Sequence, residues 1–337
     1  MGLGGHLLWT SVIRTLNEQS GRPVRVCHTP LVSDLVAGRL YCGDVSLADD
    51  PVFLNNPRIE CPPTRRKTRW VRAIDRAVHA AIRRLGVERR YESLVLALSQ
   101  VRTRRTGQFD AHLDLKRHSY VAREEPQRMV WKPGGHIVDI ILANYGKRAS
   151  DHRCEMYFSP ADEETARSAR LAHGIGDDYV VVEPNSNESW YGDLRAWPFD
   201  RWQAVVDTLA DDGTQVVQIG ERGRPVLRRV VDVTGRIPFR IAVLLMKRAR
   251  LFLGLDGGLM NAANAAGTPA VIVWGGTALP EFAGYPELHS VVCHYVECAP
   301  CGLRGNCPHG KKCLNEIGVD EVLARVAGAL TRRVRMP

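Results

Sequence analysis

The sequence has no long hydrophobic segment. None of its apolar runs reaches the ~18 residues that indicate a membrane-spanning helix. Residues 1–21 also lack the basic start, the continuous apolar stretch and the small-residue cleavage site of a secretory signal. We therefore expect a cytoplasmic protein, and this leaves room for a peripheral contact with the inner face of a membrane.

Aromatic residues are scarce, and the chain shows no internal repeat or low-complexity segment. Phe, Trp and Tyr together make up 7% of the 337 residues. They are sparse within 71–110, whereas proteins that bind single-stranded nucleic acid interleave aromatic and basic side chains. This scarcity disfavours nucleic-acid binding, which stays an alternative because of the charge distribution.

Positive charge is concentrated in the first half of the chain. Residues 1–150 contain 25 Lys and Arg against 14 Asp and Glu, a net +11, whereas residues 151–337 contain 21 against 23, a net −2. The densest basic stretch is 65–105. A basic face favours an anionic partner, such as a phosphorylated glycan, an acidic membrane surface or a nucleic acid. The same charge also suits a solvated face of an arginine-rich protein.

Strand and helix patterns alternate in the second half. Short apolar segments predict strands at 178–184, 214–220, 251–256 and 269–276. Apolar residues at helical spacing predict helices at 199–213, 224–235, 239–249 and 319–332. This alternation favours an α/β protein whose parallel sheet is covered by helices on both faces.

The first half follows a similar pattern less regularly. Helices are predicted at 6–21, 69–86 and 136–146, and strands at 22–29 and 111–115. The length favours two domains, with a boundary expected near 146–165. The segment GLGG follows Met1 directly, where a doubly wound domain ordinarily begins with a strand. We therefore expect the true start of the protein to lie upstream.

The segment LGLDGGLMNAANAAG (253–267) places an acid and two glycines between a strand and a helix. Free backbone N–H groups and aligned peptide dipoles at a helix N-terminus favour phosphate. Gly257 and Gly258 have no side chain to obstruct an anion, and Asp256 lies where parallel sheets bind ligands. An ordinary strand-to-helix turn has the same pattern. The expected donor-binding residues of this segment are Asp256, Gly257, Gly258, Leu259, Met260 and Asn261.

Two other strand ends carry polar residues of matching chemistry. A polar loop with Asn185 and Ser186 leads to Arg195, a candidate bidentate phosphate clamp. Glu221 follows the next strand, within reach of a ribose or a base. An anion nest, a cation and a carboxylate at neighbouring strand ends predict a site for a nucleoside-diphosphate compound.

In this order the motifs resemble glycosyltransferase family 9, the bacterial heptosyltransferases. The N-terminal GLGGHLLWTSVIRTL resembles the opening of that family, and the other matching segments are RAWP (195–198), GE (220–221), DGGLMN (256–261) and GTPAVIVWGG (267–276). The resemblance implies an α/β GT-B fold of two facing Rossmann-like, doubly wound parallel-sheet domains. It assigns 1–150 to acceptor binding and 151–318 to the nucleotide-sugar donor, and leaves 319–337 as a C-terminal helix and tail.

The resemblance also implies an inverting transfer without a catalytic metal. An acceptor hydroxyl would attack the anomeric carbon while the nucleoside diphosphate leaves, and a base would take the hydroxyl proton. The family has an aspartate after the first glycine of its opening motif, where this chain has Gly5. His6, directly after it, is the candidate base, and Asp114 and His136 are further candidates.

Four of the nine cysteines are clustered within CAPCGLRGNCPHGKKC (298–313). Four thiolates at this spacing suit one tetrahedral ion, and zinc and iron both accept a four-sulfur shell. Some protein-modifying heptosyltransferases that resemble this chain carry a cysteine-bound iron of structural role. Reduced free thiols, or a disulfide formed on purification, are the alternatives. The expected ligands of a structural metal are Cys298, Cys301, Cys307 and Cys313.

The sequence therefore predicts a glycosyltransferase that takes a sugar, a heptose by resemblance, from a nucleoside-diphosphate donor. The acceptor is expected to be a hydroxyl of an anionic glycan, such as the lipopolysaccharide core, or of a protein. One alternative is another GT-B sugar enzyme such as an epimerase. A second is a catalytically impaired family member acting as a scaffold, which Gly5 suggests. A third is a nucleic-acid-binding protein with a four-cysteine metal knuckle.

Overall fold

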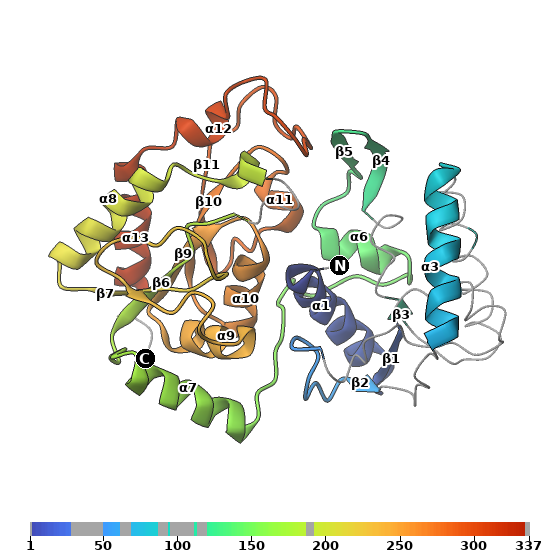
Figure 1. Cartoon of the computed structure of the whole chain (residues 1–337), viewed down its shortest axis with the longest axis horizontal. Coiled ribbons are helices and arrows are strands. Elements are labelled where there is room, and N and C mark those ends of the chain that lie inside the picture. The colour runs from blue at the N-terminus through green and yellow to red at the C-terminus, as the bar shows by residue number, and fades with distance from the viewer. Residues whose placement is uncertain are drawn as a thin grey trace.

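The computed structural model describes residues 2–27, 50–60, 69–86, 94, 111–112, 120–186 and 192–333. Two α/β units lie side by side, an N-terminal unit drawn in blue to green and a C-terminal unit drawn in green to red (Figure 1). The segment that joins them runs down between the two units and leads to α7 at the bottom of the view. In the part of the chain described, no helix has both the length and the hydrophobicity needed to cross a membrane.

The C-terminal unit is built on a six-stranded parallel sheet. Its strands are β6 (Tyr179–Val182), β7 (Gln215–Gln218), β8 (Val231–Asp232), β9 (Leu251–Leu255), β10 (Ala270–Trp274) and β11 (His289–Cys293). Their spatial order is β11-β10-β9-β6-β7-β8. This is the doubly wound order in which the chain reverses direction across the sheet, here between β6 and β9. The four predicted strands are confirmed, while β8 and β11 were not predicted.

Helices cover both faces of this sheet. On one face α8 (Phe199–Asp211) and α13 (Val319–Arg333) pack together, with Trp202 and Val322 in the same buried cluster as the strand residue Val180. The other face carries α9 (Phe239–Arg248) and α10 (Gly258–Ala266). All residues of β6, β9 and β10 are buried, which explains why these strands are almost wholly apolar.

The helix predicted at 224–235 is wrong. The chain there forms turns and then β8. Two buried glutamines on neighbouring elements bind the backbone N–H groups: Gln218 Oε1 accepts from Leu227 N (2.8 Å), and Gln203 Oε1 accepts from Arg228 N (2.8 Å). Arg229 has a positive φ of 60°, which is incompatible with a right-handed helix. The helical spacing of apolar residues was therefore outweighed by tertiary hydrogen bonds.

The N-terminal unit begins with a helix and contains a small parallel sheet of order β2-β1-β3. Its described elements are α1 (Leu3–Ser20), β1 (Val24–Cys27), β2 (Ile59–Glu60), α3 (Arg69–Arg84), β3 (Ala111–His112), β4 (Val121–Glu125), β5 (Arg128–Trp131) and α6 (Ile137–Ala143). The three predicted helices are confirmed. The antiparallel hairpin of β4 and β5 was not predicted.

The connection to the C-terminal unit leads into α7 (Pro160–Ala172), which begins at a capping box formed by Ser159 and Asp162. Arg240 of α9 is buried beneath this turn and binds three segments at once. It donates to the Asp162 carboxylate, to Tyr157 O (2.6 Å) and to Pro51 O (2.7 Å). One guanidinium therefore links α9 to the connection, to the start of α7 and to a loop of the N-terminal unit. The remaining short helices are the 3-10 turn η2 (Gly192–Arg195), α11 (Pro280–Ala283) and α12 (Lys312–Asn315).

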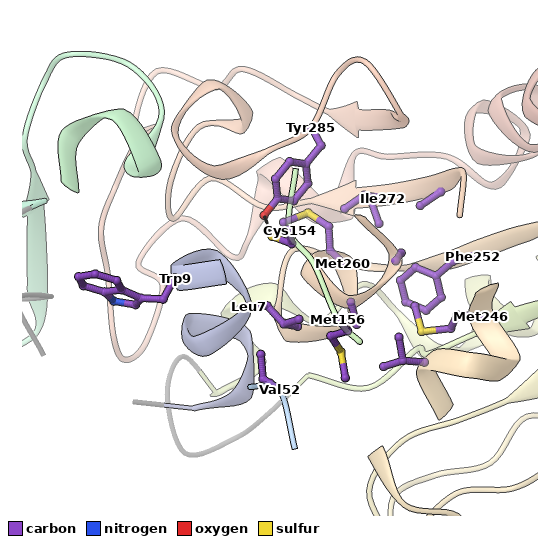
Figure 2. Close-up of a cluster of buried hydrophobic side chains, with 14 of the residues drawn as sticks. Leu7, Trp9, Val52, Cys154, Met156, Met246, Phe252, Met260, Ile272 and Tyr285 are labelled. Carbon is purple, nitrogen blue, oxygen red and sulfur yellow. Dashed lines mark hydrogen bonds between the residues drawn. The ribbon is translucent and has the colours of Figure 1, made fainter. Parts of the chain in front are cut away.

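One apolar cluster runs through both units. Leu7 of α1, Met156 of the connection and Met260 of α10 lie together, and the cluster continues to Phe252 and Ile272 of the sheet (Figure 2). Helices α1 and α10 approach each other closely because each has a glycine at the contact, Gly4 in α1 and Gly258 in α10. A Cβ on Gly4 would lie only 2.6 Å from Gly258 Cα.

Candidate functional site

The strand order points to the edge where β6 and β9 end. These strands are neighbours, and Glu183 N donates to Leu253 O (2.9 Å) just beyond β6. Glu183 follows β6 and Asp256 follows β9, so two acids flank the position where the sheet reverses direction. In doubly wound sheets, ligands bind outside the carboxyl ends of the strands at this position.

Asp256 is buried against Arg195 at this edge. Its carboxyl is 4% exposed, and burial raises its pKa to about 6 although the Arg195 charge favours ionisation. Arg195 Nε lies 3.1 Å from Asp256 Oδ2, and Arg195 also donates to Asp256 O (3.2 Å). The second carboxylate oxygen, Oδ1, is buried and has no partner in another residue that the structure describes. The structure thus brings two predicted site residues into direct contact.

Glu183 was not predicted as a site residue. It is 8% exposed, and burial raises its pKa to about 8, so it is largely protonated at neutral pH. Its Oε1 accepts from Asn185 N (2.7 Å), and its Oε2 occupies the space of a side chain at Gly220, where a Cβ would be 1.9 Å away. The signal in the sequence is one acid directly after the apolar run YVVV, within the strand predicted at 178–184.

Of the other polar residues in the neighbouring loops, some make hydrogen bonds that hold the loops together and one is exposed to solvent. Asn185 Nδ2 donates to Pro225 O (3.1 Å), and Arg224 donates to Ser186 O, so these residues join two loops at the ends of β6 and β7. Glu221 is exposed on the second of these loops. Its charge is close enough to Glu183 to contribute to the raised pKa of that acid.

The N-cap residue of α10 is Gly257, which has no side chain to bind the first backbone N–H groups of the helix. A Cβ on Gly257 would meet nothing within 4 Å, as expected of a residue that borders open space. Gly258 has a different role, because it is where Gly4 of α1 packs. Leu259 is half-buried against the shared core. The two glycines therefore serve two purposes, a ligand-accessible turn and a close helix contact.

Met260 and Asn261 are used for packing. Met260 is 3% exposed within the shared core. Asn261 donates from Nδ2 to Gly4 O (2.9 Å) and accepts at Oδ1 from the Tyr285 hydroxyl (2.8 Å). Both side chains hold α1 against the C-terminal unit, and their expected role in donor binding stays a prediction.

His6 lies in the first turns of α1, two residues from the contact at Gly4. Its Nδ1 is 2.8 Å from Asp50 Oδ2, and both side chains are buried. Burial alone would raise the pKa of Asp50, but the hydrogen bond and charge of His6, together with N–H groups of Val52 and Phe53, lower it. An ionised carboxylate thus orients the imidazole. Asp50 is 44 residues away in sequence, and no local signal pointed to it.

The other candidate bases are Asp114 and His136. Asp114 is outside the described residues. His136 caps α6 by accepting from Val138 N (3.3 Å), and its ring stacks on His152 with 3.8 Å between centroids. Burial and the neighbouring His152 charge lower the pKa of His136 to about 3. His136 is a structural residue of α6.

The four clustered cysteines are half-buried free thiols. Burial raises the pKa of Cys301 and of Cys313, and in each case the negative charges of neighbouring cysteines raise it further. Cys313 Sγ accepts from Gly276 N (3.3 Å). In the ranges that the structure describes, which include all four cysteines, no three His, Cys, Asp or Glu side chains are placed to hold a metal ion. The thiols gather as predicted without forming a metal shell.

The cysteine loop also joins the two units. Cys301 N and Gly302 N donate to Gly276 O (2.8 Å) and Thr277 O (3.0 Å), next to β10. On its other side Met129 N of β5 donates to Gly302 O (2.7 Å). The loop is thus an additional strand-like strap between the sheet of one unit and the hairpin of the other.

The model of glycosyltransferase family 9 (heptosyltransferase) matches residues 144–312, which are 169 of the 337 residues. The chain belongs to this family. Most of the match falls on the unit that carries Asp256, Arg195 and the uncapped helix.

Named relatives and solved structures are similar to this chain over different lengths. Two proteins named lipopolysaccharide heptosyltransferase 3, one from Escherichia coli and one from its strain K12, are 24% and 25% identical over 48% and 56% of the chain. These matches span 51% and 64% of the relatives' own lengths. A family 9 glycosyl transferase from Veillonella parvula (TM-score 0.63, 16% identity) is similar over 98% of this chain and 95% of its own. The E. coli ADP-heptose lps heptosyltransferase II (TM-score 0.57, 14% identity) is similar over 98% and 97%. The expected GT-B fold is confirmed.

Proposed function

We propose that this protein transfers a sugar from a nucleoside-diphosphate donor to a hydroxyl acceptor. The observation that carries the proposal is the edge between β6 and β9, where the Arg195–Asp256 pair adjoins the uncapped N-terminus of α10. A cation and free backbone N–H groups suit a diphosphate, and the buried carboxylate oxygen of Asp256 suits a sugar or ribose hydroxyl. Membership of the heptosyltransferase family and the names of the relatives support a heptose carried by ADP.

The donor would lie across the carboxyl ends of β6, β7 and β9. Backbone N–H groups at 257–260 and the Arg195 guanidinium would stabilise the charge that develops on the leaving diphosphate, which is usually the largest catalytic contribution. Asn185, Ser186 and Glu221 border this region and would contact the nucleoside. Protonated Glu183 could both donate and accept a hydrogen bond there.

His6 would act as the base in an inverting displacement. Asp50 at Nδ1 favours the tautomer whose Nε2 accepts a proton. The acceptor oxygen would lose its proton to His6 as it forms the new glycosidic bond, and the bond to the diphosphate would break in the same step. The His6–Asp50 pair thus offers a base in place of the family aspartate, whose position is occupied by Gly5 in this chain. This argues against the alternative of a catalytically impaired family member.

The expected acceptor is an anionic glycan, such as the lipopolysaccharide core, or a protein. The net +11 of residues 1–150 supports acceptor binding by the N-terminal unit. The division into an acceptor domain at 1–150 and a donor domain at 151–318, together with a cytoplasmic location, belongs to the same proposal. No observation favours a nucleic acid as the partner.

The cysteine cluster supports a separate proposal of a structural zinc or iron. Its four thiols form a donor set that both metals accept, although the thiols would have to move into a tetrahedral shell. Elemental analysis of the purified chain beside a Cys301→Ser variant tests this. The proposal of a structural metal is excluded if the purified chain contains neither zinc nor iron in stoichiometric amount.

Thermal unfolding with a panel of nucleotide sugars tests donor binding. ADP-heptose should raise the melting temperature because it binds only the folded state, whereas GDP- and UDP-sugars should not. Arg195→Gln should abolish the shift, and Arg167→Gln, an exposed arginine of α7, is the matched control. If no nucleotide sugar stabilises the protein, donor binding is refuted.

Transfer assays with ADP-heptose and a lipopolysaccharide core test the base. His6→Ala should lower kcat by about 10²–10⁴-fold. Asp50→Asn should shift the acidic limb of the pH–rate profile while leaving donor binding intact, and Asp50→Glu should restore part of the rate. An unchanged rate and profile in both His6 and Asp50 variants would remove this pair from the mechanism.

A further inference from the structure

Helix α3 turns an apolar stripe outward. It stands at the outer edge of the N-terminal unit, on the side away from the six-stranded sheet (Figure 1). Trp70 is 82% exposed, Ile74 58% and Leu85 73%. Ala77 and Ala81 are exposed at helical spacing between Trp70 and Leu85, so the stripe runs along α3 and ends at Leu85 in the turn that follows the helix.

Another side of α3 is much less exposed. Asp75 is 6% exposed and Val78 and Ile82 are partly buried, so this face anchors the helix. The outward stripe is therefore apolar surface additional to that needed for folding. A contiguous exposed apolar patch of this kind marks a binding surface.

Arginines border the stripe. Arg69, Arg76 and Arg84 are all exposed and fall on the helix face next to the apolar residues. The only acid in α3 is the buried Asp75, so the exposed face has charge of one sign. A helix with an arginine-rich face, low overall hydrophobicity and Trp, Ile and Leu on the adjoining face is suited to the plane of a membrane interface.

We propose that α3 docks on an anionic lipid bilayer. The apolar stripe would enter the boundary between headgroups and acyl chains, with Trp70 at headgroup level, where indole rings are favoured. Arg69, Arg76 and Arg84 would lie among the lipid phosphates, their aliphatic stems along the apolar surface. This docking does not depend on the transferase function.

Charge and shape favour lipid over the other occupants. A second copy of α3 on this stripe would bring arginines against arginines without an exposed acid of the helix to pair with them. A nucleic acid would match the arginines but would leave Ile74 and Leu85 without a partner, because its exposed backbone is polar and charged. An anionic bilayer satisfies both the charge and the apolar stripe.

Co-sedimentation of the full chain with vesicles tests the proposal. Vesicles of phosphatidylcholine alone are compared with vesicles containing one quarter phosphatidylglycerol. Binding is expected only to the anionic vesicles. Trp70→Ser combined with Ile74→Ser should weaken binding at least tenfold, and removing one arginine, as in Arg76→Gln, should weaken it about fivefold. Leu171→Ser is the matched control, since Leu171 is 78% exposed on α7, outside α3.

The alternatives have distinct results. Failure to bind anionic vesicles, or equal binding by the Trp70/Ile74 double variant and wild type, overturns the proposal. Self-association that the double variant abolishes, without vesicle binding, would assign the stripe to a second copy instead. RNA binding that Arg76→Gln weakens and the apolar variant leaves unchanged, again without vesicle binding, would assign the face to nucleic acid. Each variant alters exposed side chains, and circular dichroism confirms that it is folded.

Discussion

Replacing Glu183 with Gln should remove the pH dependence that this buried acid imposes on stability. Gln keeps the carbonyl oxygen that accepts from Asn185 N and removes only the titration. Burial raises the Glu183 pKa from 4.5 to about 8. At roughly 1.4 kcal/mol per pKa unit, full ionisation of the folded protein costs up to about 5 kcal/mol relative to the unfolded chain.

The sign follows from proton binding. Between pH 4.5 and 8 the unfolded chain loses the Glu183 proton while the folded protein retains it, so the free energy of unfolding falls as the pH rises. The stabilising difference is complete below 4.5 and is lost as the pH passes 8. Relative to wild type, Glu183→Gln should therefore become progressively more stable by about 1.4 kcal/mol per pH unit across this range.

Urea unfolding of both proteins at pH 4.5, 6, 7 and 8.5 measures the difference. Glu164→Gln, an exposed acid of α7 paired with Arg167, is the control and should give a nearly flat difference because surface ion pairs contribute little. Parallel stability curves for wild type and Glu183→Gln would refute the reasoning. They would mean that Glu183 is solvated, and its assignment to a buried ligand-site edge would fall with it.

Three further substitutions test the contacts that join the two units. Gly4→Ala should lower stability by about 1–3 kcal/mol in thermal unfolding, since its Cβ meets the Gly258 backbone at 2.6 Å; an unaltered melting temperature would contradict this. Arg240→Ala should cost about 1.5–3 kcal/mol in urea unfolding because it removes the charge-assisted hydrogen bonds to the Asp162 carboxylate, and an effect below about 0.5 kcal/mol would contradict a linking role of Arg240. Gly302→Ala should speed hydrogen exchange at the Met129 amide, because its Cβ would lie 1.8 Å from Met129 O at a φ of 62°; retained protection would count against the strap.

Much of the C-terminal unit could be predicted because its chemistry is local in sequence. Apolar strands that end in an acid or a glycine, each followed by a helix, imply parallel strands whose carboxyl ends share one edge. That reasoning was enough to place Arg195 and Asp256 at the same edge. It could not predict that they would touch, since the strand order decides which loops are neighbours.

The errors other than Glu183 come from contacts between distant segments. Asp50 contacts His6 only because its loop packs on α1. No periodicity in the sequence indicates such a contact. Asn261 was assigned to a ligand because its motif position suggested one, yet its amide is occupied by Gly4 and Tyr285. The helix predicted at 224–235 failed for a similar reason, because Gln203 and Gln218 were not considered as partners for its backbone.

The apolar cluster that Leu7, Met156 and Met260 share has a consequence for cooperativity. Neither unit can lose its structure without uncovering the other's interior, so heating should produce a single calorimetric transition instead of one for each unit. For the same reason, cutting the chain between α6 and α7 would yield two fragments, each with an exposed apolar face that is prone to aggregate. The two units depend on each other to fold, although each has its own sheet.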